Sequence, residues 1–189
     1  MKTSYLFLAQ GFEEIEALTV VDVMRRAGMP LKTVSITNEH TVTGAHGIPI
    51  VADMIIADAD VSDAEWLIAP GGMPGSTNLA ECDTLTNVLK QHYAQNGKIA
   101  AICAAPAVVL APLGILNGKE ATCYPGFECK GAIMRDTPVV ALENIITANG
   151  PATALMFALA IVANSMGEAV TKEIGNGMLL YPKEVNFYF

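Results

Sequence analysis

The sequence predicts an α/β fold in which helices cover both faces of a mostly parallel sheet. Short, wholly apolar segments recur along the chain, as is typical of strands buried on both faces. Most of them are followed by segments with helical spacing of apolar residues, so strands and helices alternate. With 189 residues, the chain is long enough for one domain with a full core, and we expect a single domain over residues 1–189.

The expected elements follow the chain in order. Strands are expected over 3–9, 31–36, 66–69, 99–102, 138–142 and 144–147, and helices over 13–27, 83–96, 107–111, 151–163 and 168–176. Two strand-like pieces lie between residues 38 and 53, and Pro49 in the second piece indicates an edge position. Residues 120–134 are glycine-rich and are expected to form only short strands.

Charge and apolar run lengths exclude several classes of protein. The net charge is −8 and no basic cluster stands out, so a nucleic-acid partner is not expected. The first residues have too short an apolar stretch for a secretory signal, and the longest apolar run, near 152–163, is shorter than the roughly 20 residues of a bilayer span. We therefore expect a cytoplasmic protein, not bound to membrane, with reduced cysteines.

Cys103 stands where the apolar strand 99–102 meets the helix-forming segment 107–111. This position places the sulfur at the positive end of a helix, where free N–H groups favour a thiolate. Lowering a thiol pKa from about 8.5 to about 6.5 takes only about 2.7 kcal/mol. We expect a nucleophile elbow with an ionised Cys103, and the pattern leaves a buried structural cysteine as the alternative.

Glu16 is the second unusual residue. At helical spacing it aligns with Val20 and Val23, which places a carboxyl group in an apolar stripe. A buried carboxylate without a partner is costly, so Glu16 should be protonated or hydrogen-bonded, unless it bends out to solvent. Glu13, in the first turn of the same helix, is expected to reach water.

Gly71 and Gly72 directly follow the apolar strand 66–69. Adjacent glycines leave backbone N–H groups uncovered, so this turn can serve as an oxyanion hole. The same residues are also compatible with a tight turn that has no catalytic role. The carboxyl ends of parallel strands meet at one edge of a sheet. Glu16, the glycine turn and Cys103 should therefore meet there.

The other cysteines and the histidines carry weaker signals. Cys82 lies between two acids and is expected at the surface where a helix begins. Cys123 and Cys129 could meet across a turn as an oxidation-sensitive pair, or they could be ordinary reduced cysteines. No cysteine or histidine has zinc-ligand spacing, so no metal is expected. Surface positions are expected for all three histidines, His40, His46 and His92.

Several long motifs in the same order resemble a known family. They are QGFEEIEA at 10–17, VDVMRRAG at 21–28, APGGMPG at 69–75, AAICAAPAVVLA at 100–111 and NGPATALMFALAIV at 149–162. Together they are similar to the ThiJ/PfpI superfamily, class I glutamine amidotransferase-like, and closest to its parkinsonism-associated deglycase (DJ-one type) branch. The resemblance covers nearly the whole chain. It implies a flavodoxin-like three-layer sandwich, a homodimer and a reactive cysteine.

The resemblance also implies roles for particular residues. The reactive cysteine falls on Cys103, the protonated glutamate that hydrogen-bonds it on Glu16, and the backbone donors on Gly72 and Ala104, with Gly71 shaping the turn. The implied activities are glyoxalase-type hydration of 2-oxoaldehydes such as methylglyoxal and removal of early glycation adducts, without metal or cofactor. The alternative is an oxidative-stress-sensing or chaperone-like protein whose cysteine is oxidised to sulfinate.

The chain departs from related branches at two positions. Ala104 stands where a protease-like branch has a histidine, which argues against a peptidase. Tyr124 stands where the deglycase branch often has a histidine; it could contact a substrate oxygen, but a tyrosine hydroxyl, with an ordinary pKa of about 10, is a poor proton shuttle. An amidohydrolase would need a late histidine, and none follows His92. The candidate dimer surfaces are the first helix and the aromatic tail, Tyr181, Phe187, Tyr188 and Phe189.

Overall fold

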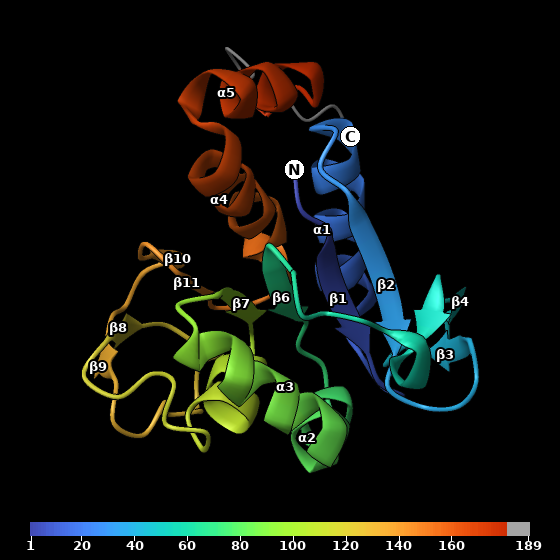
Figure 1. The fold of residues 1–189 in the computed structure, drawn as a ribbon. Coiled ribbons are helices and arrows are strands. Elements are labelled where there is room, and N and C mark those ends of the chain that lie inside the picture. Colours follow the sequence, from blue (N-terminus) through green and yellow to red (C-terminus); the bar gives the residue numbers. More distant parts are fainter. Residues whose placement is uncertain (181–189) are drawn as a thin grey trace, which may run out of the picture.

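The computed structural model describes residues 1–180 and consists of a central sheet between two layers of helices (Figure 1). The sheet has seven strands in the order β10-β11-β7-β6-β1-β2-β5. All neighbouring strands are parallel except β10, which runs antiparallel to β11. This arrangement is the predicted α/β sandwich.

The strands of this sheet are β1 (Ser4–Leu8), β2 (Leu31–Ser35), β5 (Met54–Ile55), β6 (Trp66–Ala69), β7 (Lys98–Ile102), β10 (Val139–Ala141) and β11 (Ile145–Ala148). Two small sheets pair β3 (Thr41–Thr43) with β4 (Pro49–Val51), and β8 (Glu120–Ala121) with β9 (Ile133–Met134). The helices are α1 (Glu14–Arg26), α2 (Gly75–Glu81), α3 (Asp83–Ala94), α4 (Ala154–Met166) and α5 (Glu168–Gly177). Short helical turns are η1 (Ile56–Asp58), η2 (Pro106–Leu110) and η3 (Pro151–Thr153).

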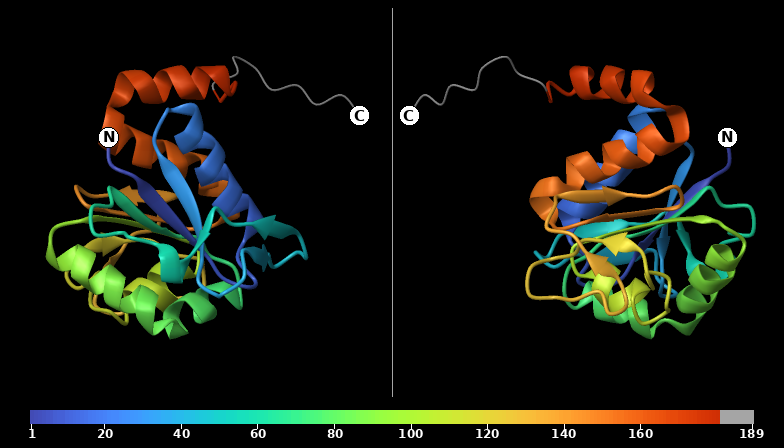
Figure 2. Two further views of the ribbon diagram at one scale, coloured as in Figure 1. Left: turned by 45° about the vertical axis from the view of Figure 1, so that its right-hand side comes forward. Right: turned by 90° about the vertical axis from the view of Figure 1, so that its left-hand side faces the viewer.

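The strands divide the core into two halves because successive side chains point to opposite faces. In β1, Leu6 and Leu8 belong to the core half that also contains side chains of α1 and α4, whereas Phe7 belongs to the half that contains side chains of α3. Figure 2 shows α4 and α5, orange to red, on one side of the sheet and the green helices on the other. Both faces are thus covered, which explains the continuous apolar runs of the central strands.

Most expected elements are present within one or two residues of the predicted bounds, but α2 and β5 were not predicted. The helix α2 begins at Gly75 and contains several polar residues, so intrinsic propensity gives little indication of it. The aromatic tail proposed as a dimer surface lies outside the described residues. Within residues 1–180, no helix has the length and apolar character needed to cross a bilayer.

The predicted surface position of His92 is wrong. Its residue is only 8% exposed, and Nε2 lies 3.2 Å from the carbonyl oxygen of Lys98. The ring packs so closely against Gly97 that a Cβ atom there would overlap it. The chain that returns from α3 into β7 covers the ring, which spacing within the helix alone does not reveal.

Phe157 tests how much the core between α4 and the sheet contributes to stability. The side chain is fully buried, so Phe157→Ala should lower the free energy of unfolding by about 3–5 kcal/mol. Urea unfolding followed by circular dichroism measures this loss. The matched control is Met156→Ala on the same helix, since Met156 is 44% exposed and its truncation should cost less than about 1 kcal/mol. Equal losses would contradict the assigned faces of α4.

Candidate active site

Three neighbouring strands bring the candidate residues together at one edge of the sheet. The strands β7, β6 and β1 are adjacent in the sheet (Figure 1), and along the chain Cys103, Gly71 and Glu16 follow them in the same order. In the register, Ala69 pairs with Ala101. Gly71 and Cys103, each two residues further along, therefore leave the sheet at the same level, as predicted.

The backbone at Cys103 has the strained conformation of a nucleophile elbow. Its φ is 65°, a left-handed value that is uncommon for a residue other than glycine. Its N–H donates to the carbonyl of Ala148 at 2.9 Å, and its own carbonyl accepts from the N–H of Tyr124 at 2.8 Å. These two bonds hold the strained residue in place between β7 and η2. The residue is 8% exposed, so its surroundings are largely protein.

Glu16 is fully buried, which rules out the alternative that it bends out to solvent. Its Oε2 accepts a hydrogen bond from the N–H of Gly71 at 2.7 Å. Its Oε1 accepts no bond from an N–H or O–H group of the described residues, and the carboxyl instead interacts with the sulfur of Cys103. Burial raises the pKa of Glu16 to about 7, against the opposing hydrogen bond from Gly71. The group can therefore hold or release a proton near neutral pH.

Gly71 permits the close approach of these two side chains. A Cβ atom at this position would lie 2.5 Å from the Cβ of Cys103 and 2.7 Å from Oε2 of Glu16. The carbonyl of Gly71 also accepts from the N–H of Glu13 at 2.9 Å, which ties the turn to the start of α1. Gly72 has a φ of 89°, which favours glycine. The two glycines are thus required by the packing of the site.

The predicted ionisation of Cys103 is wrong for this resting site. Burial, followed by the negative charge of Glu16, raises the pKa of the thiol to about 12. Hydrogen bonds from the N–H groups of Gly72 and Ala104 act in the opposite direction but do not outweigh burial. The same N–H groups are the predicted backbone donors, and both face the sulfur. A nucleophilic Cys103 must therefore lose its proton to a neighbouring group, and Glu16 is in contact with it.

Tyr124 lies beside the elbow, and its side chain is exposed to solvent. Its N–H binds the carbonyl of Cys103, while the residue is 45% exposed. A Cβ atom added to Gly150, after β11, would lie 3.4 Å from Cδ2 of the Tyr124 ring. The ring therefore borders the same edge of the sheet, between the elbow and the loop after β11.

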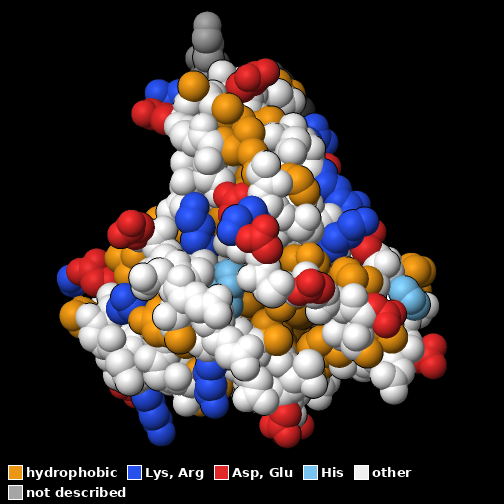
Figure 3. Space-filling view, viewed as in Figure 1, with side chains coloured by type: hydrophobic (Ala, Val, Ile, Leu, Met, Phe, Trp, Pro, Cys, Tyr) orange, Lys and Arg blue, Asp and Glu red, His pale blue; other side chains and the backbone are white. Residues whose placement is uncertain are grey.

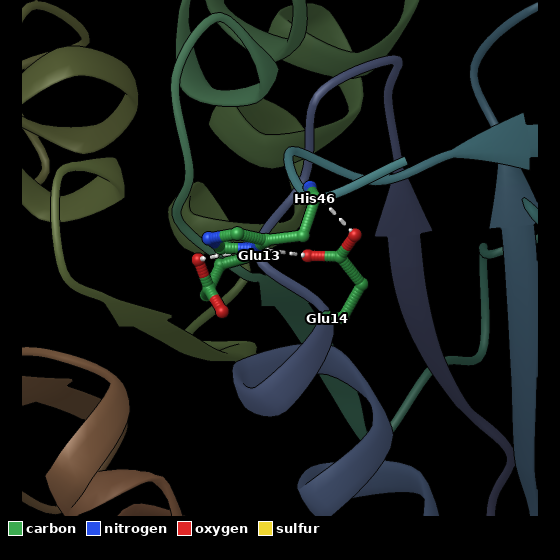
Figure 4. Close-up of side chains that lie close together, drawn as sticks. All are labelled: Glu13, Glu14 and His46. Carbon is green, nitrogen blue, oxygen red and sulfur yellow. Dashed lines mark hydrogen bonds and ion pairs between the residues drawn. The ribbon is translucent and has the colours of Figure 1, made fainter. Parts of the chain in front are cut away.

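A polar cluster at the start of α1 was not predicted as a unit (Figure 4). His46, from the turn between β3 and β4, donates its N–H to Oε1 of Glu14 at 2.8 Å, and its Nδ1 lies 2.9 Å from Oε2. Oε2 of Glu13 is 3.7 Å from the same ring nitrogen, and the Glu13 side chain is 11% exposed, so it reaches water only slightly. Burial raises the pKa of Glu14, but hydrogen bonds from His46 hold it below its ordinary value overall.

The cluster behaves as an ion pair. The hydrogen bond to Glu14 raises the pKa of His46, so the imidazolium and the carboxylate stabilise one another. Ligand atoms of Glu13, Glu14 and His46 lie within 4.8 Å of one another, a spacing that a metal ion could also use. Both oxygens of Glu14 are already bonded to His46, however. No signal within either segment relates Glu14 to a histidine 32 residues away.

The raised pKa of Glu16 predicts a pH dependence of stability. Between the ordinary value of 4.5 and the native value of about 7, the folded state binds more protons than the unfolded state. The stabilisation is fully present below pH 4.5 and is lost as the pH rises through about 7. Glu16→Gln removes this titration. The free energy of unfolding of the variant, measured relative to that of the wild type, should therefore rise by up to about 3 kcal/mol between pH 5 and pH 8.

Urea unfolding at both pH values measures this difference. Gln keeps an oxygen that can accept from Gly71, so the turn should persist in the variant. The control is Glu81→Gln, which removes a carboxyl group from an exposed position. A relative stability of Glu16→Gln that is independent of pH would contradict the raised pKa.

Known proteins are similar to this chain in both sequence and fold. The chain is 35% identical over 185 residues to protein DJ-1 homolog A of Arabidopsis thaliana, covering 96% of this chain and 47% of that protein. It is 36% identical to the glutathione-independent glyoxalase DJR-1.2 of Caenorhabditis elegans, covering 86% and 87% of the two chains. The oxidised DJ-1 of Toxoplasma gondii superposes with a TM-score of 0.89 at 33% identity, covering 96% and 100%.

The chain spans about half the length of the Arabidopsis relative and the full length of the Toxoplasma structure. The sequence pattern of the DJ-1/PfpI family matches residues 2–164, which include all of the elbow, the glycine turn and Glu16. The resemblance drawn from the motifs is confirmed, and so is the flavodoxin-like sandwich that it implied. This protein belongs to the DJ-1/PfpI family.

Proposed function

We propose that this protein is a cysteine-dependent glyoxalase or deglycase that acts on small 2-oxoaldehydes such as methylglyoxal, or on early glycation adducts. The observation that carries the proposal is the contact between Cys103, on a strained elbow, and the buried Glu16, whose pKa of about 7 suits proton transfer. The Caenorhabditis relative named as a glutathione-independent glyoxalase supports the same chemistry.

The first step forms a bond between Cys103 and the substrate. The sulfur adds to the aldehyde carbon and the C=O double bond becomes a single bond, while the thiol proton passes to the carboxylate of Glu16. Glu16 then gives this proton to the new oxyanion, which yields a hemithioacetal and restores the carboxylate. The N–H groups of Gly72 and Ala104, which face the sulfur, are placed to stabilise the oxygen that becomes negative. Proton transfer to Glu16 allows the attack although the resting thiol is protonated.

The second step moves hydrogen within the substrate. Glu16 takes the proton from the former aldehyde carbon and returns it to the neighbouring carbon, so the first carbon is oxidised and the ketone is reduced. The product is a thioester of a 2-hydroxy acid, which water hydrolyses to the acid and free Cys103. Electrons balance within the substrate, so the step needs no external oxidant. We assign Tyr124 as a hydrogen-bond contact to a substrate oxygen, since it is exposed beside the elbow.

The second candidate function is sensing of oxidants. The buried Oε1 of Glu16 lacks a conventional partner, and a protonated carboxyl there could donate to an oxygen on the sulfur. The N–H groups of Gly72 and Ala104 face the same atom. A sulfinate at Cys103 would therefore find hydrogen-bond donors already in place.

We further propose a cytoplasmic homodimer that pairs through α1 and the β3–β4 hairpin. Large apolar residues are exposed on both segments, among them Ile15 at 56% and Val51 at 73%. Figure 3 shows hydrophobic side chains at the surface around the hairpin. His46 ties the hairpin to α1 through Glu14, so the two segments form one continuous surface. Such exposed apolar surface is typical of an interface.

Lactate formation from methylglyoxal tests the leading proposal. Cys103→Ser should reduce the rate at least about 100-fold, because a hydroxyl is a much weaker nucleophile than the thiol. The matched control is Cys82→Ser, half-buried at the start of α3, which should keep the wild-type rate. Equal rates for wild type and Cys103→Ser would exclude the mechanism.

Intact-mass measurement after mild peroxide tests the sensing alternative. The wild type should gain two oxygen atoms at Cys103, and Cys103→Ala should show no such gain. Glu16→Leu, which removes the hydrogen-bond donor, should stop oxidation at one oxygen or continue to three, since the sulfinate would lose its partner. A wild type that resists peroxide would argue against sensing.

A further inference from the structure

Cys123 and Cys129 form a second sulfur site that the proposed chemistry does not use. Both are buried, at 6% and 1% exposure, and both belong to the core half that also contains side chains of α3. They are free thiols in the structure. The residues between them, 124 to 128, are all exposed, so the pair lies beneath a surface turn.

The turn brings the two sulfurs into contact. The N–H of Phe127 donates to the carbonyl of Tyr124 at 3.1 Å, which reverses the chain. The thiol of Cys123 donates a hydrogen bond to the carbonyl oxygen of Phe127 at 3.4 Å. The thiol and the backbone N–H of Cys129 both hydrogen-bond to the sulfur of Cys123. The two cysteines, six residues apart, therefore form a contacting dithiol pair and are not two separate core residues.

The two thiols are not equivalent. The hydrogen bond from the Cys129 thiol lowers the pKa of Cys123 and is stronger than the opposing effect of burial. The same bond, together with burial, raises the pKa of Cys129. Cys123 is therefore the sulfur that ionises first, and Cys129 keeps its proton as the donor.

We propose that Cys123 and Cys129 are a reversible redox site that peroxide converts to a disulfide. Cys123 loses its proton, its thiolate attacks one peroxide oxygen, and the O–O bond breaks to give a sulfenic acid and hydroxide. The hydroxide takes up the proton that Cys123 lost and leaves as water. The sulfur of Cys129 then attacks that of Cys123, the S–O bond breaks, and the hydroxide leaves as water with the thiol proton of Cys129. Two thiols are oxidised and one hydrogen peroxide is reduced to two waters. A reducing thiol reverses the reaction by exchange.

The site adjoins the elbow through a single residue. Tyr124 follows Cys123 directly, and its N–H binds the carbonyl of Cys103. A disulfide would close a small ring that contains Tyr124 and would restrain its backbone. Oxidation of the dithiol does not require glyoxalase activity at Cys103.

Peptide mapping in the Cys103→Ala variant tests the proposal without interference from the elbow. The folded protein is treated with hydrogen peroxide, its remaining thiols are blocked with N-ethylmaleimide, and it is cleaved after glutamate without reductant. Cleavage after Glu128 separates the two cysteines into peptides 121–128 and 129–143. We expect the peptides to remain joined, two hydrogen atoms lighter than their sum, and to separate on reduction.

Three variants complete the test. Cys123→Ser and Cys129→Ser in the same background should each abolish the joined peptide, whereas Cys82→Ser should leave it unchanged. In Cys129→Ser, Cys123 should instead accumulate oxygen, since its partner is gone. Separate, fully blocked peptides after a peroxide treatment that oxidises Cys103 in the wild type would overturn the proposal. Joining of Cys82 to either peptide would overturn it as well.

Discussion

The site depends on one buried carboxyl group held between a backbone N–H and a sulfur. Glu16 is removed from water, and among residues 1–180 only Gly71 and Cys103 compensate for its desolvation. A neutral carboxyl is tolerable there, whereas a carboxylate is costly, so its pKa rises to about 7. The same group makes ionisation of the neighbouring thiol more difficult. The proton that these two residues share is therefore the central feature of the site.

Geometry enforces this contact. Three parallel strands end at one level, a strained elbow directs the sulfur toward α1, and Gly71 leaves room where any side chain would overlap both partners. The strain at Cys103 is maintained by backbone bonds to Ala148 and Tyr124. Tyr124 therefore connects the elbow to the dithiol of Cys123 and Cys129. One short segment, residues 122–129, thus contains the dithiol and contacts the elbow at Cys103.

The fold was largely predictable because its strands are buried on both faces and read as unbroken apolar runs. The site was predictable in outline for the same reason, since each of its residues directly follows such a run or lies on the first helix. Secondary structure and burial were predicted wrongly where the residues of a segment do not themselves indicate its structure. The helix α2 begins with glycine, a poor helix former, and His92 is covered by the chain that follows it.

The sequence by itself determined the alternation of strands and helices, the identity of Cys103, Glu16 and the glycine turn, and the apolar stripe that buries the carboxyl. Only the tertiary structure decided the protonation of that site. A helix end favours a thiolate locally, but burial raises the pKa of both groups, and the charge of Glu16 raises that of Cys103 further. Only the folded chain also joined His46 to Glu14 and Cys129 to Cys123. The physical reason is common to all of these features: desolvation and contact depend on neighbours that the order of residues does not specify.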